Sequence, residues 1–218
     1  MKYKMVIFDF DGTLADTEDF NFTIYLDLAD KYKIKKVSKD EMGSLKKLSA
    51  FELIDHLDIK KRNIPGMIRR GRKILHGSIE NIDMCQPTMK SVLNTLHLKG
   101  ILMGVLTSNS KKNVHKFLKR HELNCFSFVD NAGMFGKEGK LKKIVSKYGL
   151  SENEALYVGD EIRDITATKH VGMDIAAVNW GYNSEEALKD NDPTYLIGVP
   201  EELLGIIFDE GGGMHDQD

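Results

Sequence analysis

The sequence predicts an α/β fold, in which a Rossmann-like, mainly parallel sheet has helices on both faces and carries a small all-helical cap domain. Short apolar runs alternate with helical repeats in residues 1–15 and 87–210, which is typical of strand–helix–strand units in one core. Residues 16–86 interrupt this alternation and contain helical patterns only, as expected of a cap inserted into that core. The tail, residues 211–218, is glycine-rich and polar, and we expect it to be disordered.

The core begins with a short buried strand at residues 6–8, and helices follow in the cap. Apolar residues four apart predict the first cap helix, and they are Phe20, Ile24, Leu28 and Tyr32. Two capping-box patterns, Ser38 with Glu41 and Ser49 with Glu52, predict two more helix starts. After a break at residues 65–66, a last helical stripe consists of Ile68, Leu75, Ile79 and Ile82.

Beyond residue 87 the alternation of helices and strands resumes. We expect strands at residues 101–106, 126–129, 155–158, 174–178 and 195–197. Gly100 and Gly149 stand where two of the intervening helices end, because glycine readily takes the left-handed conformation that closes a helix. Strands separated by helices predict right-handed crossovers and a mainly parallel sheet.

Composition excludes several classes of protein. The net charge of −2 and apolar content of 41% predict an ordinary globular chain, with neither a nucleic-acid partner nor a membrane. No apolar run approaches the length of a membrane span, and the acids that begin at Asp9 leave no room for a signal peptide. Cys85 and Cys125 form no C-x-x-C pair, so we expect reduced thiols and a cytoplasmic enzyme. The oligomeric state is not predicted.

The most informative residues are Asp9 and Asp11, which directly follow the first buried strand. Ligands of parallel α/β sheets bind outside the carboxyl ends of the strands, so two acids here are placed for chemistry. Burying two unpaired charges is costly, and a cation is the natural partner. Gly12 permits the sharp turn that follows.

Three further polar clusters follow later strands and are expected at the same edge of the sheet. Thr107, Ser108 and Asn109 precede a helix and offer hydroxyls and backbone amides to an anion. Gly136–Lys137 offers a cation for phosphoryl oxygens. Asp160 and Asp164 are four residues apart, so they share a face if a helix begins there, and such acids suit Mg²⁺.

Together these clusters resemble the motifs of the haloacid dehalogenase-like hydrolase superfamily over nearly the whole chain. Residues 9–14 resemble its first motif, Thr107 its second, Lys137 its third, and Gly159–Asp160 with Asp164 its fourth. Residues 157–183 are most similar to the phosphoglycolate phosphatase-type branch. That branch usually has a proline-containing stretch after the third-motif lysine, whereas Glu138–Gly139–Lys140 follows here, so Lys140 is the alternative to Lys137.

The resemblance implies that Asp9 attacks phosphorus and forms an aspartyl-phosphate. Asp11 then serves as general acid and base, an acid for which the superfamily's dehalogenases have no need. The implied metal is Mg²⁺, held by the Asp9 carboxylate, the Asp11 backbone carbonyl and Asp160. The phosphoryl group is expected to contact the second-motif residues and the third-motif lysine, which are Thr107, Ser108, Asn109 and Lys137. Asp164 is expected to orient Lys137 or a metal-bound water.

We therefore expect a Mg²⁺-dependent phosphatase acting on a small phosphorylated metabolite, either phosphoglycolate-like or a sugar phosphate. Basic residues of the cap either receive an acidic substrate or form an ordinary solvated face, and they are Lys46, Lys47, Arg69, Arg70 and Arg72. The alternatives are a phosphomutase of the same superfamily, a phospho-accepting signalling module, and a catalytically silent interaction protein.

Overall fold

The structure is a computed structural model of the 218-residue chain, and it describes residues 1–133 and 136–208. Within these residues, six parallel strands form one sheet in the order β3-β2-β1-β4-β5-β6. The strands are β1 (Met5–Phe8), β2 (Leu102–Thr107), β3 (Phe128–Asn131), β4 (Ala155–Gly159), β5 (Asp174–Val178) and β6 (Tyr195–Ile197). This order is that of a doubly wound Rossmann sheet, so the predicted fold class is confirmed.

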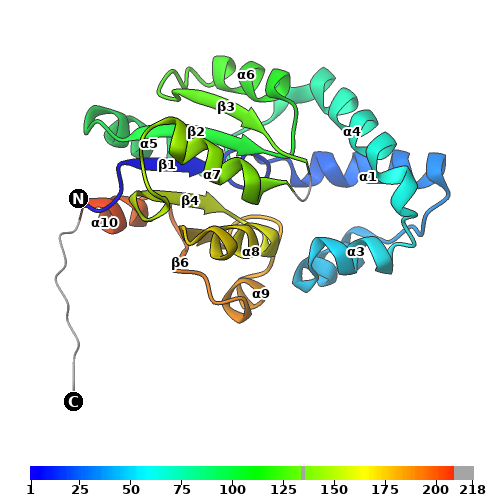
Figure 1. Ribbon diagram of the computed structural model, residues 1–218. Coiled ribbons are helices and arrows are strands. Elements are labelled where there is room, and N and C mark those ends of the chain that lie inside the picture. The colour runs from blue at the N-terminus through cyan, green and yellow to red at the C-terminus, as the bar shows by residue number, and fades with distance from the viewer. Residues whose placement is uncertain (134–135, 209–218) are drawn as a thin grey trace.

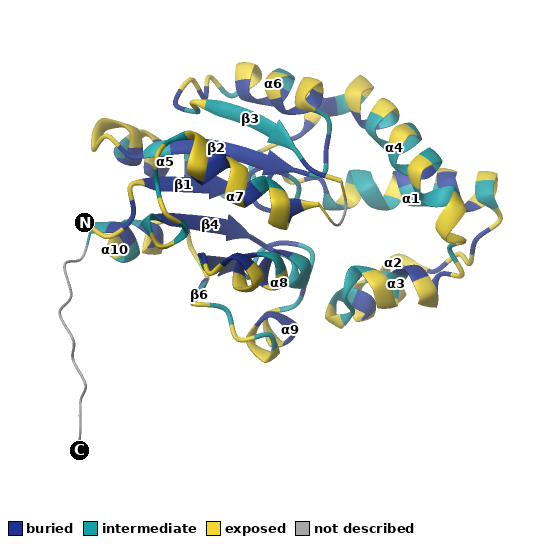
Figure 2. Cartoon of the chain, in the orientation of Figure 1, coloured by how far each residue is buried: buried dark blue, intermediate teal, exposed yellow. Residues whose placement is uncertain are grey.

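Helices cover both faces of the sheet (Figure 1). Successive side chains of β1 point to opposite faces, so Val6 and Phe8 join one apolar cluster and Met5 and Ile7 join the other. The first cluster includes residues of α5 (Met89–Leu98), α6 (Lys111–Arg120) and α10 (Glu202–Phe208). The second includes residues of α7 (Lys137–Lys147), α8 (Ile162–Val171) and α9 (Glu185–Asp190). The strands β1, β2, β4 and β5 between them are almost wholly buried, whereas β3 and β6 at the two edges of the sheet are mostly half-buried (Figure 2).

The segment between β1 and α5 consists of helices, which we propose to treat as the cap. Its elements are α1 (Glu18–Tyr32), α2 (Lys39–Ser44), η1 (Leu45–Lys47), α3 (Ala50–His56), η2 (Lys61–Asn63), α4 (Ile64–Ser78) and η3 (Ile79–Asn81). A complete capping box forms between Ser49 and Glu52, and the Ser38 hydroxyl accepts a hydrogen bond from the Glu41 amide. The cap lies beyond the carboxyl ends of the strands, on the right in Figure 1.

The two ends of the cap lie side by side. The Asp16 amide donates to the Asp83 carbonyl at 2.9 Å, and the Cys85 amide donates to the Leu14 carbonyl at 3.0 Å. The cap therefore leaves the core and returns to it through adjacent, hydrogen-bonded backbone.

The remaining elements follow from local sequence. Gly100 and Gly149 take positive φ values of 79° and 68° directly after the last residues of α5 and α7 and their caps, as expected. The short helix η4 (Glu152–Glu154) begins with a second complete capping box. None of the helices in the described part of the chain is long and apolar enough to cross a membrane. The predicted disordered tail, residues 211–218, lies outside the described residues.

Candidate active site

The register of the sheet brings the sequence motifs to one edge. Phe8 pairs with Val105 of β2 and with Val158 of β4, so Thr107 and Asp160 each lie two residues beyond a partner of Phe8. Asp9 follows Phe8 directly. β1 and β4 flank the point at which the strand order reverses, which is where doubly wound sheets leave a crevice for ligands.

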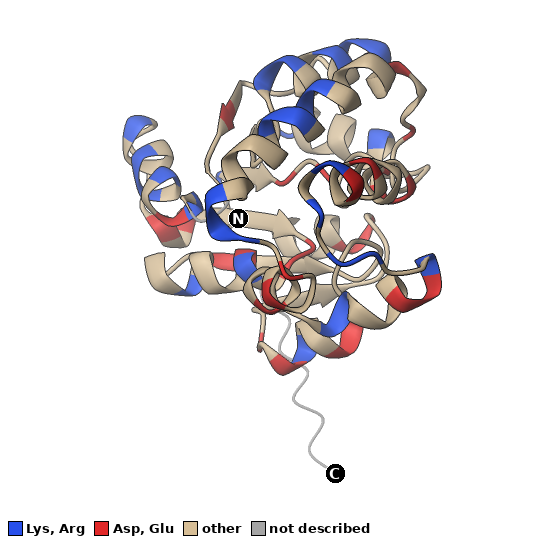
Figure 3. Cartoon of the chain, turned by 90° about the vertical axis from the view of Figure 1, so that its right-hand side faces the viewer, with Lys and Arg blue, Asp and Glu red and all other residues tan. Residues whose placement is uncertain are grey.

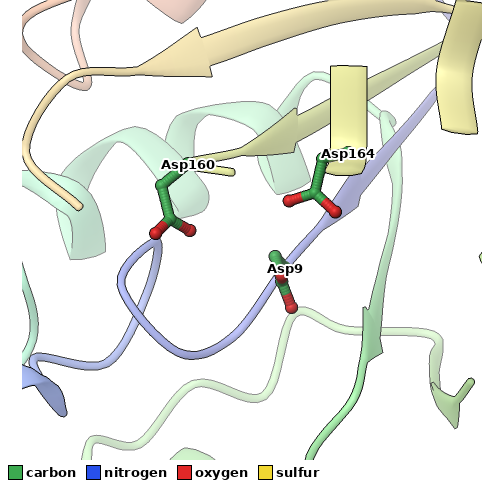
Figure 4. Close-up of side chains that lie close together, drawn as sticks. All are labelled: Asp9, Asp160 and Asp164. Atoms are coloured by element: carbon green, nitrogen blue, oxygen red, sulfur yellow. The ribbon is translucent and has the colours of Figure 1, made fainter. Parts of the chain in front are cut away.

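Three buried carboxylates gather at this crevice. One carboxylate oxygen from each of Asp9, Asp160 and Asp164 lies within 4.8 Å of the other two. Figure 4 shows the three side chains close together. Lys137 is also buried, and its Nζ donates to Asp9 Oδ2 at 2.5 Å and to Asp164 Oδ1 at 2.6 Å. Burial alone would lower the pKa of Lys137, but the charges of Asp164 and Asp9 outweigh it and raise that pKa above its usual value.

Asp160 is held by the chain on both of its oxygens. Thr13 Oγ1 donates to Oδ1 at 2.6 Å, and the Tyr182 backbone amide donates to Oδ2 at 2.8 Å. Gly12 and Gly181 leave the space for this carboxylate, because a Cβ atom on either would lie about 2.3 Å or less from an Asp160 atom. Burial and the nearby charges of Glu161 and Asp9 raise the pKa of Asp160 well above its usual value.

Asp164 leaves one buried polar atom without a partner. Its Oδ1 accepts from Lys137, whereas Oδ2 has no hydrogen-bond partner among the described residues. Burial raises the pKa of Asp164 to about 7; the charge of Lys137 opposes this shift, and the charge of Asp9 adds to it. Three buried carboxylates beside one lysine are short of positive charge, so the donor set fits a hard divalent cation such as Mg²⁺.

Asp11 is half-buried and faces different partners. Thr17 Oγ1 donates to Oδ1 at 3.0 Å, and Asn109 Nδ2 donates to both carboxylate oxygens at 3.1 and 3.0 Å. Desolvation and the charge of Asp9 raise the pKa of Asp11 to about 6, against the opposing effect of the Asn109 and Thr17 hydrogen bonds. A carboxyl group with this pKa exchanges a proton readily near neutral pH.

The second-motif residues make contacts within their own loop, with the core and with the cap. Thr107 is fully buried, and its hydroxyl accepts a hydrogen bond from the Asn109 amide at 2.9 Å. The Ser108 carbonyl accepts a hydrogen bond from Arg72 of α4, so this loop also contacts the cap. Arg163 Nη2 lies 3.4 Å from the Ser108 hydroxyl and also bonds Glu161. The side-chain amide of Asn109 thus donates to the Asp11 carboxylate, and its contact with phosphate stays a prediction.

The other basic candidates are mostly engaged elsewhere. Lys140 pairs with Asp130 at 3.0 Å, so Lys137 is the lysine that reaches the carboxylates. Lys46 pairs with Glu18 at 2.7 Å and Arg70 with Asp27 at 2.8 Å. Acidic and basic residues are intermixed over this end of the molecule (Figure 3).

Several contacts at the site carry no signal in the sequence. Tyr182 reaches Asp160 through its backbone amide, a group that every residue except proline possesses. Its hydroxyl contacts Thr17 at 2.9 Å and accepts from Asn21 at 2.5 Å, so it connects the core to α1. Thr13, by contrast, lies inside the first motif, and its position two residues after Asp11 is the signal in the sequence for its contact with Asp160.

Comparison with known proteins agrees with this geometry. The sequence pattern of the haloacid dehalogenase-like hydrolases matches residues 6–178. The chain belongs to this family. It is 28% identical over 203 residues to a phosphoglycolate phosphatase from Synechococcus elongatus, covering 92% of this chain and 95% of that protein. It is 25% identical over 215 residues to pyrophosphatase PpaX from Anoxybacillus flavithermus, covering 95% and 98%.

A haloacid dehalogenase-like family hydrolase from Streptococcus pneumoniae has the same fold, with a TM-score of 0.76 at 17% identity, covering 94% of this chain and 98% of that chain. The resemblance expected from the motifs is therefore confirmed, and with it the assignment of the chain to an enzyme family of hydrolases.

Proposed function

We propose that the chain is a Mg²⁺-dependent phosphatase that hydrolyses a small phosphomonoester through an aspartyl-phosphate. The observation that supports this most directly is the buried cluster of Asp9, Asp160 and Asp164 around Lys137. A carboxylate held in such a cluster is a nucleophile with a fixed position, and a surplus of negative charge beside it favours a divalent cation. Relatives named for phosphoglycolate and pyrophosphate hydrolysis support phosphate as the group transferred.

In this proposal Asp9 and Asp160 hold the metal with the Asp11 carbonyl. Bound Mg²⁺ supplies positive charge that permits a carboxylate to approach a phosphate dianion. A carboxylate oxygen of Asp9 attacks phosphorus, and the bond from phosphorus to the ester oxygen breaks. Asp11 gives its proton to the leaving alcohol oxygen.

The second half returns the enzyme to its starting state. Water attacks the phosphorus of the aspartyl-phosphate, Asp11 takes the proton of that water, and inorganic phosphate leaves Asp9. Lys137 donates to the Asp9 carboxylate and places a cation beside the transferred group, where charge is stabilised. Asp164 fixes the position of that lysine.

The test is phosphate release from a panel of phosphomonoesters, with phosphoglycolate, sugar phosphates and nucleotides, in Mg²⁺ and in a chelator. Asp9→Asn should abolish release, whereas Asp16→Asn, an exposed acid seven residues later, should keep it. Appreciable turnover by the Asp9→Asn variant would exclude Asp9 as the nucleophile. Recovery of the labelled phosphoryl group on a sugar, and not as inorganic phosphate, would favour the phosphomutase. An aspartyl-phosphate that is stable for minutes would favour the signalling module.

A further inference from the structure

A cavity of about 310 Å³ lies between the cap helices and the crevice. Asp11, Ser108 and Asn109 line its core end, and α1 and α4 form much of its walls. A second cavity of about 390 Å³ adjoins it and shares Tyr25, Leu28 and Ile54 with it. Volumes of this size suit a small-molecule ligand.

The lining of the first cavity is strongly apolar away from Asp11. Its walls are made by aliphatic side chains, among them Ile24, Leu28, Ile54, Ile64, Met67 and Leu75. Arg72 is the only lysine or arginine among its lining residues, and its guanidinium donates to the Ser108 carbonyl. Of the other basic cap residues, Lys46 and Arg70 are paired with acids.

The position of the cavity relates it to one part of the substrate. In the proposed function, Asp11 protonates the ester oxygen of the leaving alcohol, so that alcohol must lie on the Asp11 side of the phosphorus. Asp11 and Asn109 line one end of the cavity, and residues of the cap helices α1 and α4 line most of the rest. The leaving alcohol therefore lies in the space that the apolar walls enclose.

We propose that this cavity binds the alcohol portion of the substrate, and that this portion is predominantly apolar. The inference rests on the proposed phosphatase function and narrows its substrate to phosphomonoesters of aliphatic or aromatic alcohols. Few polar side chains line these walls, among them Asn21, Tyr25 and Arg72, so a sugar would place most of its hydroxyl groups against aliphatic side chains, which is unfavourable. An aliphatic chain would gain about four-fold in affinity for each methylene that it buries.

Two homologous series test the proposal separately from turnover. The first measures dissociation constants of methyl-, ethyl-, propyl- and butylphosphonate in Mg²⁺ by titration calorimetry, because the carbon–phosphorus bond resists hydrolysis. The second measures kcat/KM for the matching alkyl phosphates, whose leaving alcohols differ little in acidity. We expect affinity and kcat/KM to rise about three- to four-fold with each methylene.

A matched pair of variants locates the effect. Ile68 lines the cavity from α4, so Ile68→Trp should fill it and flatten both series while methylphosphonate binds as before. Lys73→Trp adds the same ring at an exposed position of the same helix and should leave both series steep. Unchanged methylphosphonate binding shows that a variant has kept its folded site.

The outcomes separate this inference from the proposed function. Constant affinity along the phosphonate series, with methyl phosphate still hydrolysed, would overturn the apolar subsite and leave the phosphatase standing. A steep phosphonate series without release of phosphate from any ester would keep the subsite and overturn the phosphatase. A steep series that Ile68→Trp does not flatten would place the alcohol elsewhere.

Discussion

Asn109 donates one side-chain amide nitrogen to both carboxylate oxygens of Asp11, at 3.1 and 3.0 Å. The orientation of that amide is fixed in turn, because Asn109 Oδ1 accepts from the Ser110 amide at 2.7 Å and from Asn113 Nδ2 at 2.9 Å. Asn113 also donates to the carbonyl of Arg72 in α4 at 3.0 Å. The proposed general acid is thus oriented by a hydrogen-bond chain that extends into the cap.

Replacing Asn109 with alanine should lower kcat about 10- to 100-fold with little change in KM, because hydrogen bonds to a charged group contribute about 1.5–3 kcal/mol. The loss of a favourable contact to the charged form should also raise the apparent pKa of the general acid in the pH profile of kcat. Steady-state kinetics between pH 5 and 8 measure both effects. A higher KM at unchanged kcat would instead make Asn109 a phosphate ligand, as the sequence suggested.

Asp11→Asn should impair esters of poor leaving groups far more than esters of good ones. An alkoxide must be protonated as it leaves, whereas 4-nitrophenolate leaves as a stable anion without that help. We expect kcat/KM, which reports the steps up to formation of the aspartyl-phosphate, to fall at least about 100-fold for an alkyl phosphate and much less for 4-nitrophenyl phosphate. The value of kcat should fall for both substrates, because Asp11 also assists hydrolysis of the aspartyl-phosphate. Equal losses of kcat/KM on both substrates would mean that Asp11 does not act as the acid in the first step.

Lys137→Met should destabilise the fold as well as remove activity. It would leave Asp9 and Asp164 buried without their shared cation, and breaking a buried pair in this way costs about 3–5 kcal/mol. Lys140→Met is the matched control, since Lys140 pairs with Asp130 on a partly exposed surface and should cost about 1 kcal/mol or less. Urea denaturation of the two variants, compared with the parent, measures the difference.

Asp160→Asn should raise the stability of the metal-free protein and remove its response to Mg²⁺. The substitution relieves repulsion with Asp9, and an asparagine can still accept from the Tyr182 amide. For the parent protein, Mg²⁺ at about 100 times its dissociation constant should add about 2.7 kcal/mol. Thermal unfolding in Mg²⁺ and in a chelator tests this; an equal Mg²⁺ shift in both proteins would remove Asp160 from the metal site.

The interactions of Asp130 predict that the folded protein loses stability in acid. Partial burial acts to raise its pKa, but hydrogen bonds from Lys111 and Lys140 prevail and hold that pKa at about 2. The folded-state pKa is lower than that of an unfolded aspartate, so the contribution is present above about pH 4 and is lost as pH falls toward 2. After allowance for solvent screening, Asp130→Asn should cost about 1 kcal/mol at pH 7.

The same cost should shrink steadily between pH 4 and pH 2. Urea denaturation at pH 7, 4 and 3 measures the stability that Asp130→Asn costs. Asp192→Asn, at a highly exposed position, is the control. An Asp130→Asn difference that stays constant over this range would show that the carboxylate is not stabilised by its lysines.

Short apolar strands were predictable from sequence, because a short apolar run bounded by polar residues is compatible with few other structures. Residues 174–178 and 195–197 were placed at their observed bounds. The third strand was expected at 126–129 and is found at Phe128–Asn131. Its register is fixed by pairing with β2, where Gly104 leaves room for the Phe128 ring, and a single segment carries no trace of that long-range contact.

In the candidate site, too, some features could be predicted from the sequence and others could not. The acids Asp9, Asp160 and Asp164 and the lysine Lys137 could be named in advance, because their chemistry is carried by their own side chains. The cavity in the cap could not, since it arises from the packing of α1, α3 and α4 against one another. The helices α9 and α10 were not anticipated, because neither has the serine–glutamate capping-box pattern that marks the equally short helices α2 and α3.

The cap leaves and rejoins the core through the paired backbone of Leu14 with Cys85 and of Asp16 with Asp83. A short turn between these adjacent segments would replace the whole helical excursion without lengthening or straining any strand of the sheet. Helical inserts of different size could thus be exchanged between these two segments without moving the acids that follow β1 and β4. In the proposed function, the part of the chain that selects the alcohol can therefore change in size while the backbone of the strands beside the phosphorus stays the same.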